Sequence, residues 1–166
     1  MSQIAGILKQ PLTHEWETPL DFYRALDAEF GFVLDAAASS DNALCQHFYT
    51  AGMDGLRFEW RWHNGPVWVN PPYGTQIGKW VAKAAEEGRY VPVVMLIPAR
   101  TETAYWHDHV MHAAEIRFVR GRLRFSGYTV NAPFPSAVVV FRPDYFGPPR
   151  VSAIGRDGSQ ESEVAA

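Results

Sequence analysis

The chain has 166 residues, of which 47% are hydrophobic, so it can bury one sizeable core but is too short for two ordinary domains. Its formal net charge of −3 argues against a generic polyanion binder, and its single cysteine, Cys45, excludes an intrachain disulfide and a multi-cysteine zinc site. Because the sequence contains neither a long apolar run nor a signal-peptide pattern, we expect a soluble, cytoplasmic protein with no membrane-spanning segment.

The first predicted element is a helix over residues 18–31. Its apolar residues recur at helical spacing, Thr18 can serve as the N-cap, Pro19 takes the first helical position and Gly31 ends the helix. Short apolar runs after it predict strands, and longer segments between them predict helical connectors. The strands are expected at residues 32–38, ending at Asp35, and at 67–69, 91–99, 115–121 and 136–143, and the connectors at 75–88 and 101–114.

Strands that alternate with helices predict an α/β fold with a mostly parallel sheet. Only a loop separates the last two strands, so one of them should run antiparallel to the rest. About thirty residues separate Ala36 from Pro66, too few for two further strands and two helices, so one edge of the sheet should be short. We place one domain at residues 14–150, an N-terminal extension at 1–13 and a disordered tail rich in Gly, Ser and Glu at 151–166.

Charge is distributed unevenly along the chain. Residues 1–60 hold nine acidic and three basic residues, a net charge of −6, whereas residues 61–150 hold eleven basic and six acidic residues, a net charge of +5. The stretch from Ile116 to Pro143 has no acidic residue but contains Arg117, Arg120, Arg122, Arg124 and Arg142. Such a stretch either follows nucleic-acid phosphates or forms the solvated face of a strand, and the pattern alone leaves both open.

The predicted strand at 67–69 runs directly into Asn70-Pro71-Pro72-Tyr73, at the strand end where ligands bind in open α/β sheets. Asn70 offers an amide oxygen and Pro71 a backbone carbonyl, whose direction is restricted because Pro72 holds Pro71 in extended geometry. Two rigid acceptors suit an –NH2 group, because accepting both of its hydrogens stabilises the positive charge that develops as the nitrogen attacks an electrophile. Tyr73 supplies a flat face for a base. The alternative is a proline-rich turn that merely ends the strand.

Asn-Pro-Pro-Tyr at a strand end resembles the catalytic signature of S-adenosylmethionine-dependent amino methyltransferases, chiefly those that act on the N6 amine of adenine. Further motifs follow in order: "EWETPLDFYRAL", "LDAAASSDNALCQHFYT", "DGL", "VWVNPPYG", "LIPARTETAYWH", "GRLRF" and "APFPSAVVVF". Together they resemble the phage and prophage DNA N6-adenine methyltransferase (Dam) family over roughly residues 14–143. The resemblance implies a class I, Rossmann-like domain, S-adenosyl-L-methionine as cofactor, double-stranded DNA as partner, and action in the cytoplasm of a bacterial host cell.

The resemblance also implies roles for individual residues. Thr18 and Pro19 would line the methionine end of the cofactor, Asp35 would lie near the cofactor, and Asp54 in "DGL" would meet its adenine. Helix capping and a surface turn explain the same residues structurally. In related adenine methyltransferases a second aromatic comes from the loop between the last two strands, and here the candidate is Phe134, for which the alternative is a core position.

The DNA contacts implied are Arg122 and Arg124, which would hold the backbone, and Arg100, which would approach it. The sequence departs from the class I pattern after the first strand. Most of these enzymes have a glycine-rich loop there, whereas "DAAASSDNA" is followed by no glycine until Gly52.

Three functions fit these observations. DNA adenine-N6 methylation leads; a protein-glutamine or RNA methyltransferase uses the same tetrapeptide; and a catalytically silent nucleic-acid-binding relative would explain the missing glycines. Cys45 follows no proline and lies in no predicted strand-end loop, which argues against a thiolate mechanism at the cytosine ring. His107, His109 and His112 lack an acidic partner motif such as His-Glu-x-x-His, so we expect no metal site.

Overall fold

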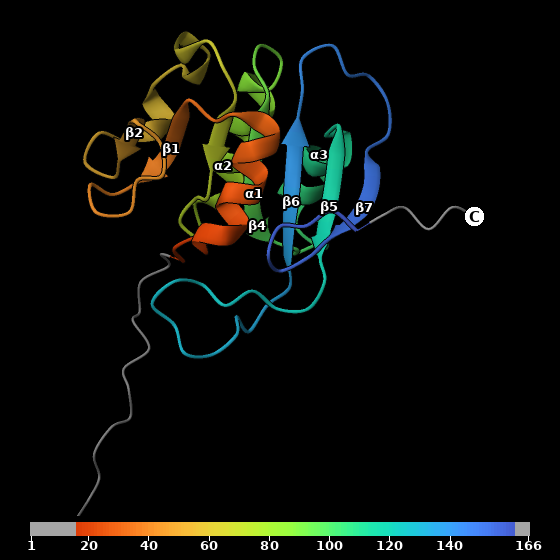
Figure 1. The fold of residues 1–166 in the computed structure, drawn as a ribbon. Coiled ribbons are helices and arrows are strands. Elements are labelled where there is room, and N and C mark those ends of the chain that lie inside the picture. Colours follow the sequence, from red (N-terminus) through yellow and green to blue (C-terminus); the bar gives the residue numbers. More distant parts are fainter. Residues whose placement is uncertain (1–15, 162–166) are drawn as a thin grey trace, which may run out of the picture.

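The computed structural model describes residues 16–161, which form a seven-stranded sheet flanked by helices (Figure 1). The strands are β1 (Leu34–Ala38), β2 (His47–Thr50), β3 (Val67–Val69), β4 (Val93–Pro98), β5 (Glu115–Val119), β6 (Ser136–Phe141) and β7 (Arg150–Ile154). The helices are α1 (Leu20–Phe30), α2 (Ile77–Glu87) and α3 (Ala104–Asp108), with 3₁₀ turns at Gly55–Arg57, Trp60–His63 and Val110–His112.

The strand order is β2-β1-β3-β4-β6-β5-β7. β6 pairs antiparallel with both β4 and β5, and the other neighbouring pairs are parallel. This confirms the predicted α/β sheet with one antiparallel strand near the C-terminus. Two strands, β1 and β2, lie beyond β3, so that edge is short, as the interval between Ala36 and Pro66 predicted.

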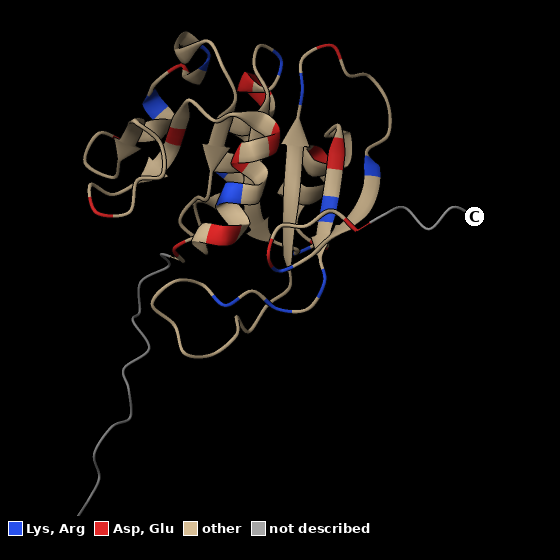
Figure 2. Cartoon of the chain, in the orientation of Figure 1, with Lys and Arg blue, Asp and Glu red and all other residues tan. Residues whose placement is uncertain are grey.

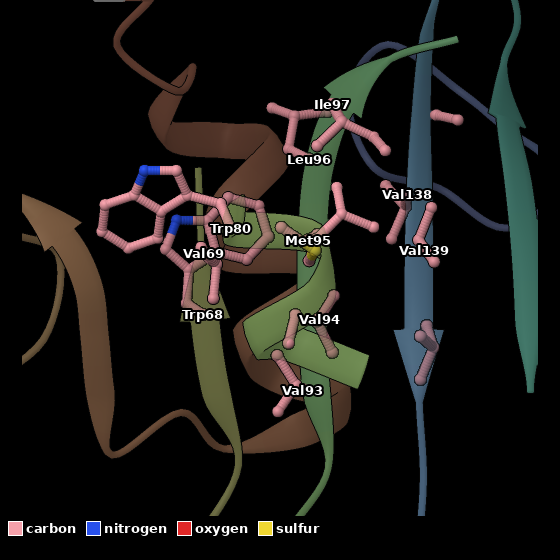
Figure 3. Packing of buried hydrophobic residues seen from close by; sticks show 14 of the residues in the cluster. Trp68, Val69, Trp80, Val93, Val94, Met95, Leu96, Ile97, Val138 and Val139 are labelled. Atoms are coloured by element: carbon pink, nitrogen blue, oxygen red, sulfur yellow. The ribbon is translucent and has the colours of Figure 1, made fainter. Parts of the chain in front are cut away.

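The core lies along the central strands. β4 and β6 are buried over their whole length, because α1 covers one face of the sheet and α2 and α3 cover the other (Figure 1). Burial on both faces explains why these strands are continuous apolar runs rather than alternating ones. Trp68 of β3, Met95 of β4 and Trp80 of α2 belong to the same buried cluster (Figure 3). No helix among the described residues is long and apolar enough to cross a membrane.

The start of α1 differs from the prediction. The helix begins at Leu20, so Pro19 is its N-cap residue, and no side chain caps it. Thr18 therefore does not act as the N-cap, and its hydroxyl is used elsewhere. Gly31 ends the helix as predicted, in the left-handed conformation with φ of 69° that glycine adopts at little cost.

The segment after α1 also needs correction. β1 does not end at Asp35 but continues to Ala38, because Ala38 pairs with Thr50 of β2, whereas β3 pairs only with Leu34 and Asp35. This pairing overrides the helical preference of the alanines. β2, which no sequence signal indicated, occupies His47–Thr50.

The C-terminal half holds two further corrections. The helix expected over residues 101–114 is only Ala104–Asp108, since His109 (φ −130°, ψ −51°) leaves the helical region before a 3₁₀ turn that buries Val110. Residues 151–154, expected to begin a disordered tail, belong to β7 together with Arg150, the last residue of the predicted domain, and β7 pairs in parallel with all of β5. Residues 162–166 and the expected extension at 1–13 lie outside the described residues.

Candidate active site

A cavity of about 630 Å³ opens at the carboxyl ends of β1, β2 and β3. Its walls come from the segment before α1, from β1 and β2 with the loops that follow them, from the loop after β3, and from α2. Five of the residues singled out in the sequence line it: Thr18, Asp35, Asp54, Asn70 and Pro72. The structure thus brings together residues that lie more than fifty positions apart in the chain.

Asn70 stands at the cavity wall with its amide held in one orientation. Its Nδ2 donates to the Trp16 carbonyl and to Thr18 Oγ1, the latter at 3.0 Å. Its Oδ1 is buried and has no hydrogen-bond partner among the described residues. A buried acceptor without a partner is costly, so this oxygen is suited to an incoming donor.

Tyr73 is packed rather than open. Its side chain is 6% exposed, and its hydroxyl donates to the Leu96 carbonyl at 3.0 Å. Burial raises the pKa of this hydroxyl well above its usual value, so it stays protonated. Tyr73 and Pro71, which is also buried, lie outside the lining of the cavity, unlike Asn70 and Pro72.

Phe134 lies against Tyr73, but edge-on. The two ring centroids are 5.6 Å apart with planes at 76°. Phe134 also meets the ring of Trp16 at 5.2 Å and 89°, and that of Phe125 at 6.0 Å. A base held between two parallel rings needs them roughly 7 to 8 Å apart, twice a van der Waals contact. The predicted partners are therefore neighbours, without a slot between them.

Asp35 is 3% exposed and its carboxylate accepts two backbone hydrogen bonds, from Leu44 at 3.2 Å and from Ala37 at 3.3 Å. Burial raises the pKa of this carboxyl to about 6, and the two backbone donors offset only part of that rise. No cation pairs with it among the described residues. A positively charged ligand in the cavity would therefore be stabilised here.

Asp54 lines the cavity in a strained turn. Its backbone is left-handed, with φ of 56°, which a non-glycine residue adopts at a cost of about 1 kcal/mol. Gly55 follows because a Cβ there would lie 2.3 Å from the Ala36 carbonyl oxygen. The surface turn expected at Asp54 is therefore also part of the cavity wall.

The loop after β1 explains why the expected glycines are missing. Among the described residues, the only non-glycine positions with positive φ are Asp54, Asn64 and Asp144, so the loop itself needs no left-handed residue. Ser39 donates its backbone N–H to Asn42 Oδ1 at 2.7 Å, which closes a tight turn in this loop. Alanine and serine suffice for this geometry.

The five arginines of the acid-free stretch divide into two groups. Arg117 pairs with Glu29 and Glu115, Arg142 with Glu115, and Arg120 with Glu161. Arg117 is buried, so the idea of a solvated strand face is wrong for it. Arg122 and Arg124 are exposed and have no acidic partner in the described part of the chain. The loop after β5 carries basic positions, drawn in blue, and no acidic ones (Figure 2). Arg100 is also exposed, in the loop after β4.

Sequence reasoning missed several residues of the cavity wall. Trp16, Tyr49, Leu56, Trp80 and Ser126 all line it. Trp16 immediately precedes the "ETP" motif, which was the one local signal available. The others belong to β2, α2 and loops whose placement depends on contacts distant in sequence.

Neither Cys45 nor the histidines enter the cavity wall. The Cys45 thiol lies 3.2 Å from the Tyr23 hydroxyl, and burial raises its pKa to about 11, so it is protonated and a poor nucleophile. Among residues 16–161 no group of three or more His, Cys, Asp or Glu side chains is placed to hold a metal ion.

A mostly parallel α/β sheet with one antiparallel strand, and a cavity at the carboxyl ends of its strands that reaches Asn70 and Pro72, are consistent with the class I methyltransferases. The chain belongs to the DNA N-6-adenine-methyltransferase (Dam) family, whose model matches residues 6–161.

Two relatives share extended similarity with the chain. The DNA N-6-adenine-methyltransferase of Escherichia phage T1 is 36% identical over 110 residues, which cover 65% of this chain and 45% of that protein. YfdM, a methyltransferase-like protein of Escherichia coli (strain K12), is 36% identical over 64 residues, which cover 36% of this chain and 70% of that protein. The chain thus spans a little under half the length of the phage T1 relative.

Proposed function

We propose that the protein transfers a methyl group from S-adenosyl-L-methionine to the N6 amine of a flipped-out adenine in double-stranded DNA, in the cytoplasm of a bacterial host cell. The observation that carries this proposal is the buried Oδ1 of Asn70, which lies at the cavity wall and has no partner among the described residues. Membership of the Dam family supports the choice of adenine and DNA.

The residues of the cavity fit the cofactor. When bound, S-adenosyl-L-methionine supplies an electrophilic methyl group on a positively charged sulfur. The buried Asp35 carboxylate is placed to attract a cation, and Thr18 would line the methionine end. Pro19, which was expected beside it, lies outside the cavity lining. Asp54 would meet the adenine of the cofactor, next to the apolar walls from Leu56 and Trp80.

The chemistry follows from the two acceptors of the motif. Asn70 Oδ1 and the Pro71 carbonyl accept the two hydrogens of the adenine N6 amine. With both hydrogens held in this way, the nitrogen lone pair would face the methyl group that the cofactor supplies. The acceptors stabilise the positive charge on N6 until its extra proton leaves to solvent. The Tyr73 hydroxyl, bonded to the Leu96 carbonyl, takes no part as a base.

The target adenine must leave the duplex, because an amine inside the base stack cannot reach the methyl group. Tyr73 and Phe134 would hold the flipped base by stacking. Arg122 and Arg124, with Arg100 nearby, would hold the phosphates of the DNA on either side.

Methyl transfer measured in parallel on DNA, RNA and protein tests this proposal. We expect labelled methyl groups in DNA, at a rate that a chelator leaves unchanged. Transfer only to RNA or to protein glutamine would assign the activity to the alternative methyltransferases. Absence of cofactor binding in a titration with S-adenosyl-L-methionine would indicate a catalytically silent nucleic-acid-binding protein.

A further inference from the structure

The orientation of the Asn70 amide is decided by the segment before α1. The Trp16 carbonyl can only accept a hydrogen bond, so the nitrogen of the amide has to be the atom that faces it. The second hydrogen of the same nitrogen reaches Thr18 Oγ1 at 3.0 Å. With both hydrogens engaged, Oδ1 points away from this segment and stays free.

Thr18 is itself held firmly. Its side chain is 7% exposed, and its carbonyl accepts from Ser126 Oγ at 3.2 Å. The neighbouring Glu17 carbonyl accepts from the Ser126 backbone N–H at 2.9 Å. The Trp16 ring stacks on Tyr128 at 4.5 Å and 21°. The segment before α1 is thus clamped between the motif and the loop that carries Arg122 and Arg124.

We infer that Thr18 is a positioning residue, whose hydroxyl holds the Asn70 amide with its oxygen turned toward the target amine. This inference rests on the proposed function, and it gives the Thr18 hydroxyl a second role beside the cofactor contact proposed above. Without the hydroxyl, only the Trp16 carbonyl holds Nδ2, so the amide rotates more freely and presents Oδ1 for a smaller fraction of the time.

Replacing the hydroxyl by a methyl group tests the inference. In Thr18→Val we expect kcat to fall roughly threefold to tenfold, the effect of one lost hydrogen bond, with cofactor affinity within about twofold of wild type. Thr18→Ser keeps the acceptor and should restore kcat. In wild-type protein, NMR of the Asn70 side-chain amide should give two resolved proton signals, which shift in Thr18→Val and not in Thr18→Ser. If the valine variant does not fold, Thr18→Ala serves in its place.

A double-mutant cycle with Asn70→Ala separates this inference from the proposed function. If Thr18 acts through Asn70, Thr18→Val should have no further effect on kcat in the Asn70→Ala background. An equal loss in both backgrounds, an unchanged kcat in the single variant, or a loss of cofactor affinity alone would overturn the positioning role. Full activity of Asn70→Ala would instead overturn the proposed function.

Discussion

The part of the site proposed to bind the cofactor is an open cavity, whereas the part proposed to bind the target base is filled by aromatic side chains. On the cofactor side, a cavity of about 630 Å³ is bordered by Asp35 and Asp54. On the base side, the Tyr73 ring packs against Phe134 and Phe125, and Phe134 in turn meets Trp16. Asn70 stands between the two halves.

This difference indicates that the two substrates bind by different routes. The cofactor can enter a preformed cavity, but a flipped adenine needs Phe134 to move away from Tyr73 first. That movement adds to the few kcal/mol that unstacking the base already costs. Substitutions in the cavity should therefore change cofactor affinity, whereas substitutions around Tyr73 and Phe134 should change the binding of the flipped base.

The largest effect is expected at the boundary between the halves. Asn70→Ala removes one of two acceptors of the amine, which should lower kcat about a hundredfold, or roughly 3 kcal/mol. Cofactor affinity should change little, because Asn70 acts on the transition state. Single-turnover kinetics with cofactor-saturated enzyme measure this. An unimpaired rate in folded Asn70→Ala would refute the role of the amide.

On the base side, Phe134→Ala should weaken binding of the flipped base by roughly 1 to 3 kcal/mol, while cofactor affinity stays nearly the same. The melting temperature should fall only moderately, by what the ring contacts with Trp16, Tyr73 and Phe125 contribute. Fluorescence of a duplex carrying a base analogue reports the flipped state. Phe146→Ala is a matched control, because Phe146 is 93% exposed in the loop between β6 and β7, at the opposite end of the sheet. A large drop in melting temperature would identify Phe134 as a core residue.

On the cofactor side, Asp35→Asn should weaken cofactor binding roughly tenfold or more, because a charged partner is removed. Asp41→Asn, in the loop after β1 but outside the cavity lining, should leave the affinity unchanged. Isothermal titration of both variants measures this, and equal affinities for them would exclude Asp35 from the cofactor site.

The pH dependence of stability gives a second test of Asp35. The pKa of Asp35 is about 6 in the folded chain, whereas the pKa of an Asp carboxyl in an unfolded chain is about 4. The folded state therefore binds more protons between these values, and stability is lost as the pH rises through that window. Asp35→Asn lacks this pH-dependent loss of stability. The melting temperature of the variant minus that of the wild type should therefore increase between about pH 4.5 and about pH 7.5. A pH-independent difference would contradict the raised pKa.

The arginines proposed to hold the DNA backbone should have a smaller effect, which is about equal for all DNA sequences. Neutralising Arg122 and Arg124 with glutamine should weaken DNA binding about equally for every sequence and flatten its salt dependence by roughly one unit of slope for each phosphate that is no longer neutralised. Arg89→Gln, in the loop between α2 and β4 at the opposite end of the strands, is the control. An unchanged slope in the double variant would leave these arginines as solvated loop residues.

The smallest effect is expected for Cys45→Ser. The thiol is protonated and lies outside the cavity lining, so activity should stay within about twofold of wild type. Loss of methyl transfer in a protein that still folds would instead support a thiolate mechanism.

Local sequence signals predicted the elements and motifs whose causes are local. Examples are the strand before Asn70, the glycine that ends α1, and the loop between β5 and β6. Features that depend on distant contacts were missed. β7 forms because β5 offers a free edge, which composition cannot reveal. Arg117 lies in an acid-free stretch, yet it is neutralised by Glu29, 88 positions away.

The same reason explains what was missing from the predicted site. The donors and acceptors of Asn70-Pro71-Pro72-Tyr73 could be read from residue chemistry alone. The partners of the Asn70 amide, Trp16 and Thr18, could not, since they lie 54 and 52 positions earlier. The edge-on packing of Phe134 on Tyr73 also required the structure, because the sequence motif predicts that the two rings are neighbours but not the angle between their planes.

The most direct test of the central claim identifies the methylated nucleoside. Plasmid DNA from cells that lack adenine methylation is incubated with the purified protein and S-adenosyl-L-methionine, digested to nucleosides and analysed by mass spectrometry. We predict N6-methyladenine with the wild-type protein and about a hundredfold less with Asn70→Ala. Methyl groups found only on cytosine, or no methylated nucleoside from a protein that binds the cofactor, would contradict the claim.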